Sequence, residues 1–114
     1  MSDAIKLLIG RRLTSVEFVH DYLQLRFDGP TLTVNGPIDV RRNASCVSNP
    51  SMNFRGAIVD VIGTEVSGGD CIIDDRIRIE FSDRSQIVIS LKPEEQVNPE
   101  AAILTGVDDN IYVW

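Results

Sequence analysis

AIKLLIG at residues 4–10 returns 53 residues later as AIVDVIG at residues 57–63. The stretches that follow the two copies also correspond, because LQLRF at 23–27 is matched by IRIEF at 77–81. We therefore interpret the chain as two copies of one unit, in which a short lead-in and a glycine precede a β-meander.

Both units show the alternation of apolar and polar residues that is typical of a strand with one buried face. The alternation is clearest at 23–27 and 77–81, and LTVN at 32–35 and IVIS at 87–90 supply the next strand of each unit. The predicted core consists of Leu23, Leu25, Phe27, Leu32, Val34, Ile77, Ile79, Phe81, Ile87 and Ile89.

Two meanders with one apolar face each must pack those faces together to remain folded in water. The predicted fold is mostly β, with α+β as the alternative. It consists of two pseudo-symmetric antiparallel β-meander units packed as a sandwich or a partly open barrel, with one or two short helices. We expect a single domain over 1–114, with repeat units at about 4–40 and 57–92, a linker at 41–56 and a C-terminal tail at 93–114.

The two lead-in segments are predicted to differ although they occupy the same place in the repeat. Residues 3–9 have apolar residues at helical spacing, and Gly10 would end that helix in the left-handed conformation. Residues 57–62 are rich in β-branched side chains, which favour a strand. Whether 57–62 is helix or strand stays open, with the strand preferred.

Three further segments have local signals. Residues 41–55 are polar and contain several Asn and Ser, which predicts a loop between the units. NPEAA at 98–102 has the cap, the first-turn proline and the acidic residue of a short helix. IYVW at 111–114 is predicted to be a final strand whose aromatic end is docked.

Charge and composition restrict the classes of partner. The net charge is −6, and it divides into +2 for residues 1–56 and −8 for residues 57–114. An acidic protein repels phosphate backbones, so we expect no nucleic acid partner. No apolar run approaches the ~20 residues of a membrane-spanning helix, and the N-terminus has no signal-peptide pattern. We therefore expect a cytoplasmic protein with reduced cysteines and no membrane partner.

A catalytic set is hard to assemble from this sequence. There is one histidine, no G-x-S-x-G serine, and no glycine-rich phosphate loop, because Gly68 and Gly69 lack a following lysine and helix. We predict no catalytic residue, no cofactor and no metal ligand, and a non-catalytic protein is preferred. The alternative is a small enzyme or metal-binding protein that uses two turns. Its residues would be His20, Asp21, Asp70, Cys71, Asp74 and Asp75.

The polar side of each meander is the remaining candidate for function. Tyrosine and arginine are enriched in binding hot spots, so a sheet face that carries them is suited to protein contact. The predicted binding residues are Tyr22, Gln24, Arg26, Arg76, Arg78 and Glu80. The partner would be another protein or a second copy of the chain in a homodimer.

Three stretches of the sequence carry a resemblance to other proteins. FSDRSQIVISLKPEE at 81–95, with NPEAA at 98–102, loosely resembles small uncharacterised bacterial proteins, and residues 9–25 are similar to them as well. Some of those proteins look like immunity proteins that neutralise a toxin. The resemblance implies a bacterial, protein-binding chain, and it supplies no functional residue.

Overall fold

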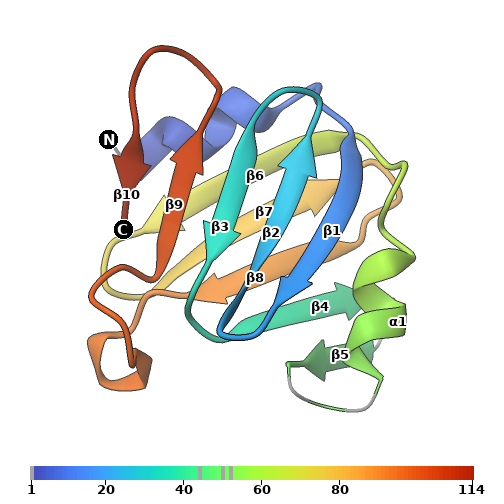
Figure 1. Cartoon of the computed structure of the whole chain (residues 1–114). Coiled ribbons are helices and arrows are strands. Elements are labelled where there is room, and N and C mark those ends of the chain that lie inside the picture. The colour runs from blue at the N-terminus through green and yellow to red at the C-terminus, as the bar shows by residue number, and fades with distance from the viewer. Residues whose placement is uncertain (1, 44, 50, 52) are drawn as a thin grey trace.

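The computed structural model describes residues 2–43, 45–49, 51 and 53–114. The described chain is mostly β. Two antiparallel sheets of five strands each pack against one another and are not closed into a barrel (Figure 1). This confirms the predicted class and selects the sandwich over the barrel.

Sheet 1 has the strand order β1-β2-β3-β9-β10, and sheet 2 has the order β5-β4-β8-β7-β6. The strands of sheet 1 are β1 (Leu13–Val19), β2 (Tyr22–Phe27), β3 (Thr31–Val34), β9 (Ala102–Thr105) and β10 (Tyr112–Val113). Those of sheet 2 are β4 (Ile38–Arg42), β5 (Ser45–Ser48), β6 (Val66–Ile72), β7 (Arg76–Phe81) and β8 (Gln86–Ser90). The helical elements are the 3-10 helices η1 (Ser2–Leu8) and η2 (Pro93–Glu95) and the α-helix α1 (Phe54–Val59).

The core lies between the two sheets, and all ten residues predicted for it are buried. Leu25 of β2 and Ile79 of β7 are both fully buried, which confirms the register predicted from the alternation. Phe54 and Ile58 of α1 add to the core from the side, as do Ile5 and Leu8 of η1.

The meander of each unit is followed by a hairpin that joins the sheet of the other unit and extends beyond the predicted unit boundaries at about 40 and 92. The chain crosses from β3 in sheet 1 to β4 in sheet 2, and later crosses back from β8 in sheet 2 to β9 in sheet 1. As a result β4 pairs with β8, and β9 pairs with β3. We call the β4–β5 and β9–β10 pairs the exchanged hairpins. They make the two units interlock.

The glycine that ends each lead-in donates a hydrogen bond to the first strand of the other unit. The Gly10 N–H donates to the Val66 carbonyl over 2.9 Å, and the Gly63 N–H donates to the Leu13 carbonyl over 2.7 Å. Both glycines have positive φ, 89° and 98°, which a residue with a Cβ adopts only with strain. β1 and β6 also shift register at equivalent positions near their first residues. The repeat in the sequence therefore corresponds to a pseudo-twofold repeat in space.

The strand predicted for 57–62 is wrong, because α1 and the turn after it occupy this segment. Phe54 and Ile58 are four residues apart, so a helix buries both on one face. The weak strand preference of β-branched residues is overridden by that burial. The first lead-in is helical as predicted, but it is a 3-10 helix rather than an α-helix.

The loop predicted for 41–55, and with it the linker at 41–56, is corrected in the same way. This segment contains the end of β4, all of β5 and the beginning of α1. Residues 44, 50 and 52 lie outside the described part of the chain. The hairpin was not predicted because its strand partner, β8, lies far away in the sequence.

The helix predicted at 98–102 is also wrong, whereas the final strand is confirmed as β10. The Ala101 carbonyl accepts from the Asn35 N–H over 2.8 Å, and the Ala101 N–H donates to the Trp114 carbonyl over 2.7 Å. These bonds hold Ala101 and Ala102 extended, and both are buried. The only 3-10 helix in the described tail is η2.

Candidate protein-binding surface

The six predicted binding residues lie on two opposite faces of the sandwich. In β2 and β7 the buried residues alternate with these six, which therefore point away from the core. Because β2 belongs to sheet 1 and β7 to sheet 2, the six residues form two sets of three. Tyr22, Gln24 and Arg26 lie on the outer face of sheet 1, and Arg76, Arg78 and Glu80 lie on the outer face of sheet 2. The six do not form one site.

The outer face of sheet 1 satisfies its own polar groups. Arg26 forms an ion pair with Glu17 of β1, and the same guanidinium donates to Gln24 Oε1 over 2.8 Å. The Gln24 amide in turn donates to the Thr33 hydroxyl of β3 over 3.3 Å. This face has paired charges, and Tyr22 is its most prominent exposed aromatic residue.

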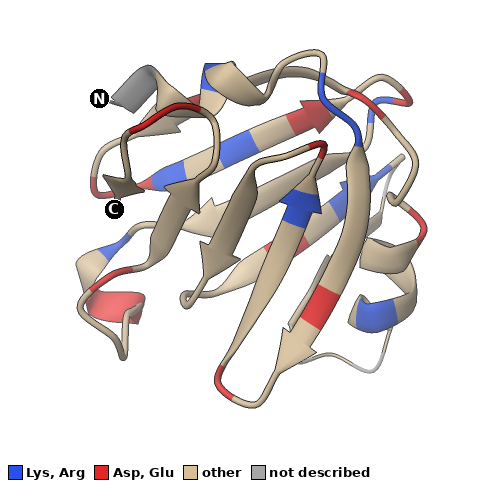
Figure 2. Ribbon diagram, turned by 45° about the horizontal axis from the view of Figure 1, so that its top comes forward, with Lys and Arg blue, Asp and Glu red and all other residues tan. Residues whose placement is uncertain are grey.

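The outer face of sheet 2 carries a denser set of charges. Along β7, two basic positions are followed by an acidic one, as Figure 2 shows. Arg78 is flanked by two carboxylates, with Nη2 3.3 Å from Asp70 Oδ2 and Nη1 3.6 Å from Glu80 Oε1. Arg76 Nη1 lies 3.8 Å from Asp75 Oδ2.

β4 extends this charged face on the other side of β8. Arg41 Nη2 lies 3.8 Å from Asp39 Oδ2, and the Ser48 hydroxyl donates to Asp39 Oδ1 over 2.7 Å. Between the charges of β7 and β4 lies Val88, which faces outward opposite Arg78 and yet is only 7% exposed. Long neighbouring side chains cover the apolar centre of this face.

Sequence reasoning missed the contribution of β4. Ile38 and Val40 are buried and alternate with Asp39 and Arg41, which is the pattern of a strand with one buried face. That alternation was the available signal. It was obscured because the segment was assigned partly to a linker.

Two polar atoms on this face have no hydrogen-bond partner although they are shielded from solvent. They are Asp70 Oδ1 and Arg76 Nε. Folded proteins pair most buried polar atoms, and an unpaired one costs about 1–3 kcal/mol. Both atoms belong to side chains that are themselves partly exposed.

A shallow groove of about 480 Å³ runs across this face. It crosses the ends of β4, β7 and β8 and reaches η2. Its lining residues are Pro37, Asp39, Arg41, Ser48, Asn49, Asp75, Arg76, Val88, Ser90, Lys92 and Glu95. Among the described residues, the Lys92 ammonium has no ion-pair partner. We call this groove and the charges of β6 and β7 beside it the sheet 2 face.

The residues of the enzyme alternative are not brought together. His20 and Asp21 lie 3.5 Å apart in the exposed β1–β2 turn, and they line a different groove from Asp74 of the β6–β7 turn. Asp70 faces outward beside Arg78, whereas Cys71 is opposite the buried Ile77 and packs against the core. Within the described ranges, no group of three or more His, Cys, Asp or Glu residues is arranged to hold a metal ion.

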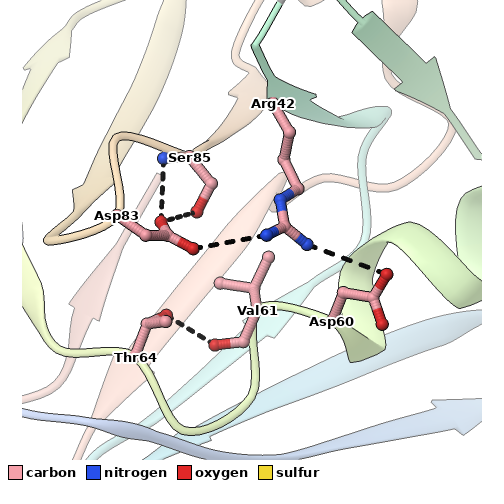
Figure 3. A network of polar contacts seen from close by, with 6 residues as sticks. All are labelled: Arg42, Asp60, Val61, Thr64, Asp83 and Ser85. Carbon is pink, nitrogen blue, oxygen red and sulfur yellow. Dashed lines mark hydrogen bonds and ion pairs between the residues drawn. The ribbon is translucent and has the colours of Figure 1, made fainter.

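Arg42 at the end of β4 joins three segments of the chain (Figure 3). Its Nη1 lies 3.7 Å from Asp60 Oδ2 after α1, and its Nη2 lies 3.5 Å from Asp83 Oδ2 in the β7–β8 turn. Asp83 Oδ1 accepts hydrogen bonds from the Ser85 hydroxyl and from the Ser85 N–H, the latter over 2.9 Å. Beside them the Thr64 hydroxyl donates to the Val61 carbonyl.

This network sets the pKa of Asp83. Partial burial raises that pKa. The Ser85 hydroxyl, the Ser85 N–H and the Arg42 charge lower it, and together they outweigh the effect of burial, so the pKa of Asp83 lies below its usual value. A carboxyl group whose pKa is depressed by folding stabilises the fold above its unfolded pKa of about 3.9. That contribution is lost as the pH falls through the folded pKa.

We expect the Ser85→Ala variant to raise the pKa of Asp83 towards its unfolded value. Titration of the carboxyl ¹³C resonance by NMR measures this directly. The loss of stability as the pH falls below about 4 should then be less steep in the variant than in the wild type. An unchanged Asp83 pKa would contradict the assignment. Ser67→Ala is the control, because the hydroxyl that it removes donates to the backbone carbonyl of Glu80 and not to a carboxylate.

Comparison of the chain with protein-family models, with characterised proteins and with solved structures finds no match. The resemblance to small bacterial proteins therefore remains an interpretation of the sequence. In the part of the chain that the structure describes, no helix has both the length and the apolar character needed to cross a membrane.

Proposed function

We propose that this chain is a non-catalytic protein-binding module that contacts its partner through the sheet 2 face. The observation that carries the proposal is the outer face of sheet 2 itself, where ion pairs of β7 and β4 lie beside a groove of about 480 Å³.

The form of the face favours a protein as the partner. Charges of both signs lie on β6 and β7 on one side of β8 and on β4 on the other side, and the apolar Val88 of β8 lies between them. Arginine is enriched in protein interfaces, and charges of both signs on a surface favour a partner with the complementary arrangement. A nucleic acid would meet an overall negative protein, with a net charge of −6.

Two kinds of protein partner fit this chemistry. One is a second copy of the chain, because a face with both signs of charge can be complementary to itself. The other is a foreign protein, such as the toxin that an immunity-like protein would neutralise. In either case a specific interface would bury about 800 Å² on each partner.

Sedimentation equilibrium over a hundredfold range of concentration, about 1–100 μM, separates the two. Wild-type chain, an Arg76→Glu/Arg78→Glu double variant and a Lys92→Glu variant would be compared. Lys92→Glu breaks no ion pair of the described chain, so it changes the charge of the face without removing an existing pair. Arg26→Glu is the matched control, because it reverses an arginine on the outer face of sheet 1.

We expect the sheet 2 variants to weaken association at least about tenfold, whereas Arg26→Glu leaves it within about twofold. If the wild type is a monomer, the same four chains would serve as bait in an extract of the source cells. A species retained by wild type and Arg26→Glu but lost from the sheet 2 variants supports the proposal. A monomer that retains nothing, or a species retained equally by all four, contradicts it.

A further inference from the structure

A second groove, of about 500 Å³, lies where the β6–β7 turn meets the crossover from β8 to β9 and the end of β10. It is separate from the groove on the sheet 2 face and shares none of its lining residues. Its volume is within the range of sites that bind small molecules, about 300–1,000 Å³. We call it the Trp114 groove.

The walls of the Trp114 groove are largely apolar. They include Ile73, Leu91, Pro93, Pro99, Val113 and Trp114. Ile73 and Val113 are 60% and 54% exposed, so this part of the surface leaves large aliphatic side chains in water. A bound apolar group would remove that surface from water, which is favourable in proportion to the area covered.

The groove is held in shape by hydrogen bonds on both sides. The backbone N–H of Trp114 donates to the Ala102 carbonyl over 2.9 Å, which holds the backbone of this residue at the edge of sheet 1. Opposite it, the Gln96 side-chain amide donates to the carbonyls of Ser90 and Lys92, over 2.9 and 3.1 Å. A site whose walls are already ordered loses less entropy when it binds a ligand.

Of the described residues that line this groove, Asp74 alone has a charged side chain. Among the described residues its carboxylate has no ion-pair or hydrogen-bond partner. The segment 93–101, which forms part of the wall, carries Glu94, Glu95 and Glu100 and contains no Lys or Arg. The charge inside the groove is therefore that of the Asp74 carboxylate, which favours a cation.

We propose that the Trp114 groove binds a small organic cation in which a primary ammonium group is attached to an aromatic or branched apolar body. The apolar body would lie against Trp114, Val113 and Ile73, and the ammonium group would pair with the Asp74 carboxylate. Aromatic faces also attract cations, so Trp114 favours the same class of ligand.

Trp114 is the only tryptophan of the chain, so its fluorescence reports directly on this groove. Phenethylamine would be titrated as the probe, with phenethyl alcohol and phenylacetate as neutral and anionic probes of similar size. We expect a saturable change in emission with the amine, at an affinity at least about tenfold higher than with either of the other two.

The residue-level test is the Asp74→Asn variant. Asp74 has a positive φ of 63°, and asparagine tolerates this conformation well, so the substitution removes the charge and retains the turn. We expect the variant to lose the preference for the amine over the alcohol. Asp109→Asn is the matched control, because it removes one exposed carboxylate that does not line the groove.

Three outcomes would overturn the proposal. The first is no saturable change with phenethylamine up to about 50 mM, beyond the usual range of weak ligands. The second is an equal response to all three probes, which would reduce the groove to a non-selective apolar surface. The third is a preference for the amine that survives Asp74→Asn, which would place the cation elsewhere.

Discussion

The free energy of unfolding is expected to fall by about 3–5 kcal/mol when Phe81 is replaced by alanine. Phe81 is the last residue of β7 and is 1% exposed, between the two sheets. Truncation removes a whole aromatic ring from a closely packed core and leaves a cavity, because neighbouring side chains relax only partly. Such a loss is comparable to the total stability of a small domain.

Urea unfolding followed by circular dichroism measures this loss, and Phe18→Ala is the matched control. Phe18 is 37% exposed at the edge of sheet 1, where its ring meets Phe54 edge-on and lies under the Arg55 guanidinium. We expect a loss of about 1 kcal/mol for this variant, since much of the ring already faces water. Equal losses for Phe81→Ala and Phe18→Ala would contradict the described core.

The second large effect is expected at a pair of adjacent glycines in β6. A Cβ on Gly69 would lie 2.8 Å from the Arg78 carbonyl oxygen and 2.9 Å from Ile5 Cγ2 of η1. The first contact is with backbone, which cannot move without disturbing the β6–β7 ladder. We therefore expect Gly69→Ala to destabilise the fold by about 1–3 kcal/mol, the usual cost of overpacking.

Gly68→Ala is the control for this prediction, because the two glycines differ in the space available to an added Cβ. A Cβ on Gly68 would come no closer than 3.6 Å to the Glu80 carboxylate, which is an ordinary contact on the outer face. We expect a change within about 0.5 kcal/mol, in either direction. Thermal unfolding of both variants measures the difference. Equal stability of Gly69→Ala and Gly68→Ala would contradict the close packing described at Gly69, between β6, β7 and η1.

The alternation of residues was enough to predict the meanders, because each unit buries one face. Leu25 and Ile79 stand in strands whose neighbours in the sheet are also their neighbours in sequence. The pairing of Ile38 with Ile89 is different, because it joins segments about fifty residues apart. No local pattern specifies which sheet a hairpin joins, so the exchanged hairpins were not foreseen.

Local preference failed where burial opposed it. Ile58 is β-branched and was assigned to a strand, yet it is fully buried on the same helix face as Phe54. Preferences of this kind amount to less than about 1 kcal/mol per residue, whereas burying such a side chain contributes about 1.5–3 kcal/mol. The six candidate binding residues point away from the core, as the alternation predicts, but their division between two faces depends on how the sheets pack.

The exchanged hairpins have a consequence for how the chain reaches its folded state. If the two units were separate molecules, the same pairing would describe an intertwined dimer, whose formation would depend on concentration. Here the segment between β5 and α1 connects them, so each unit finds its complement at the high local concentration set by a short tether. Assembly of the two halves is thereby converted into an intramolecular, concentration-independent folding reaction.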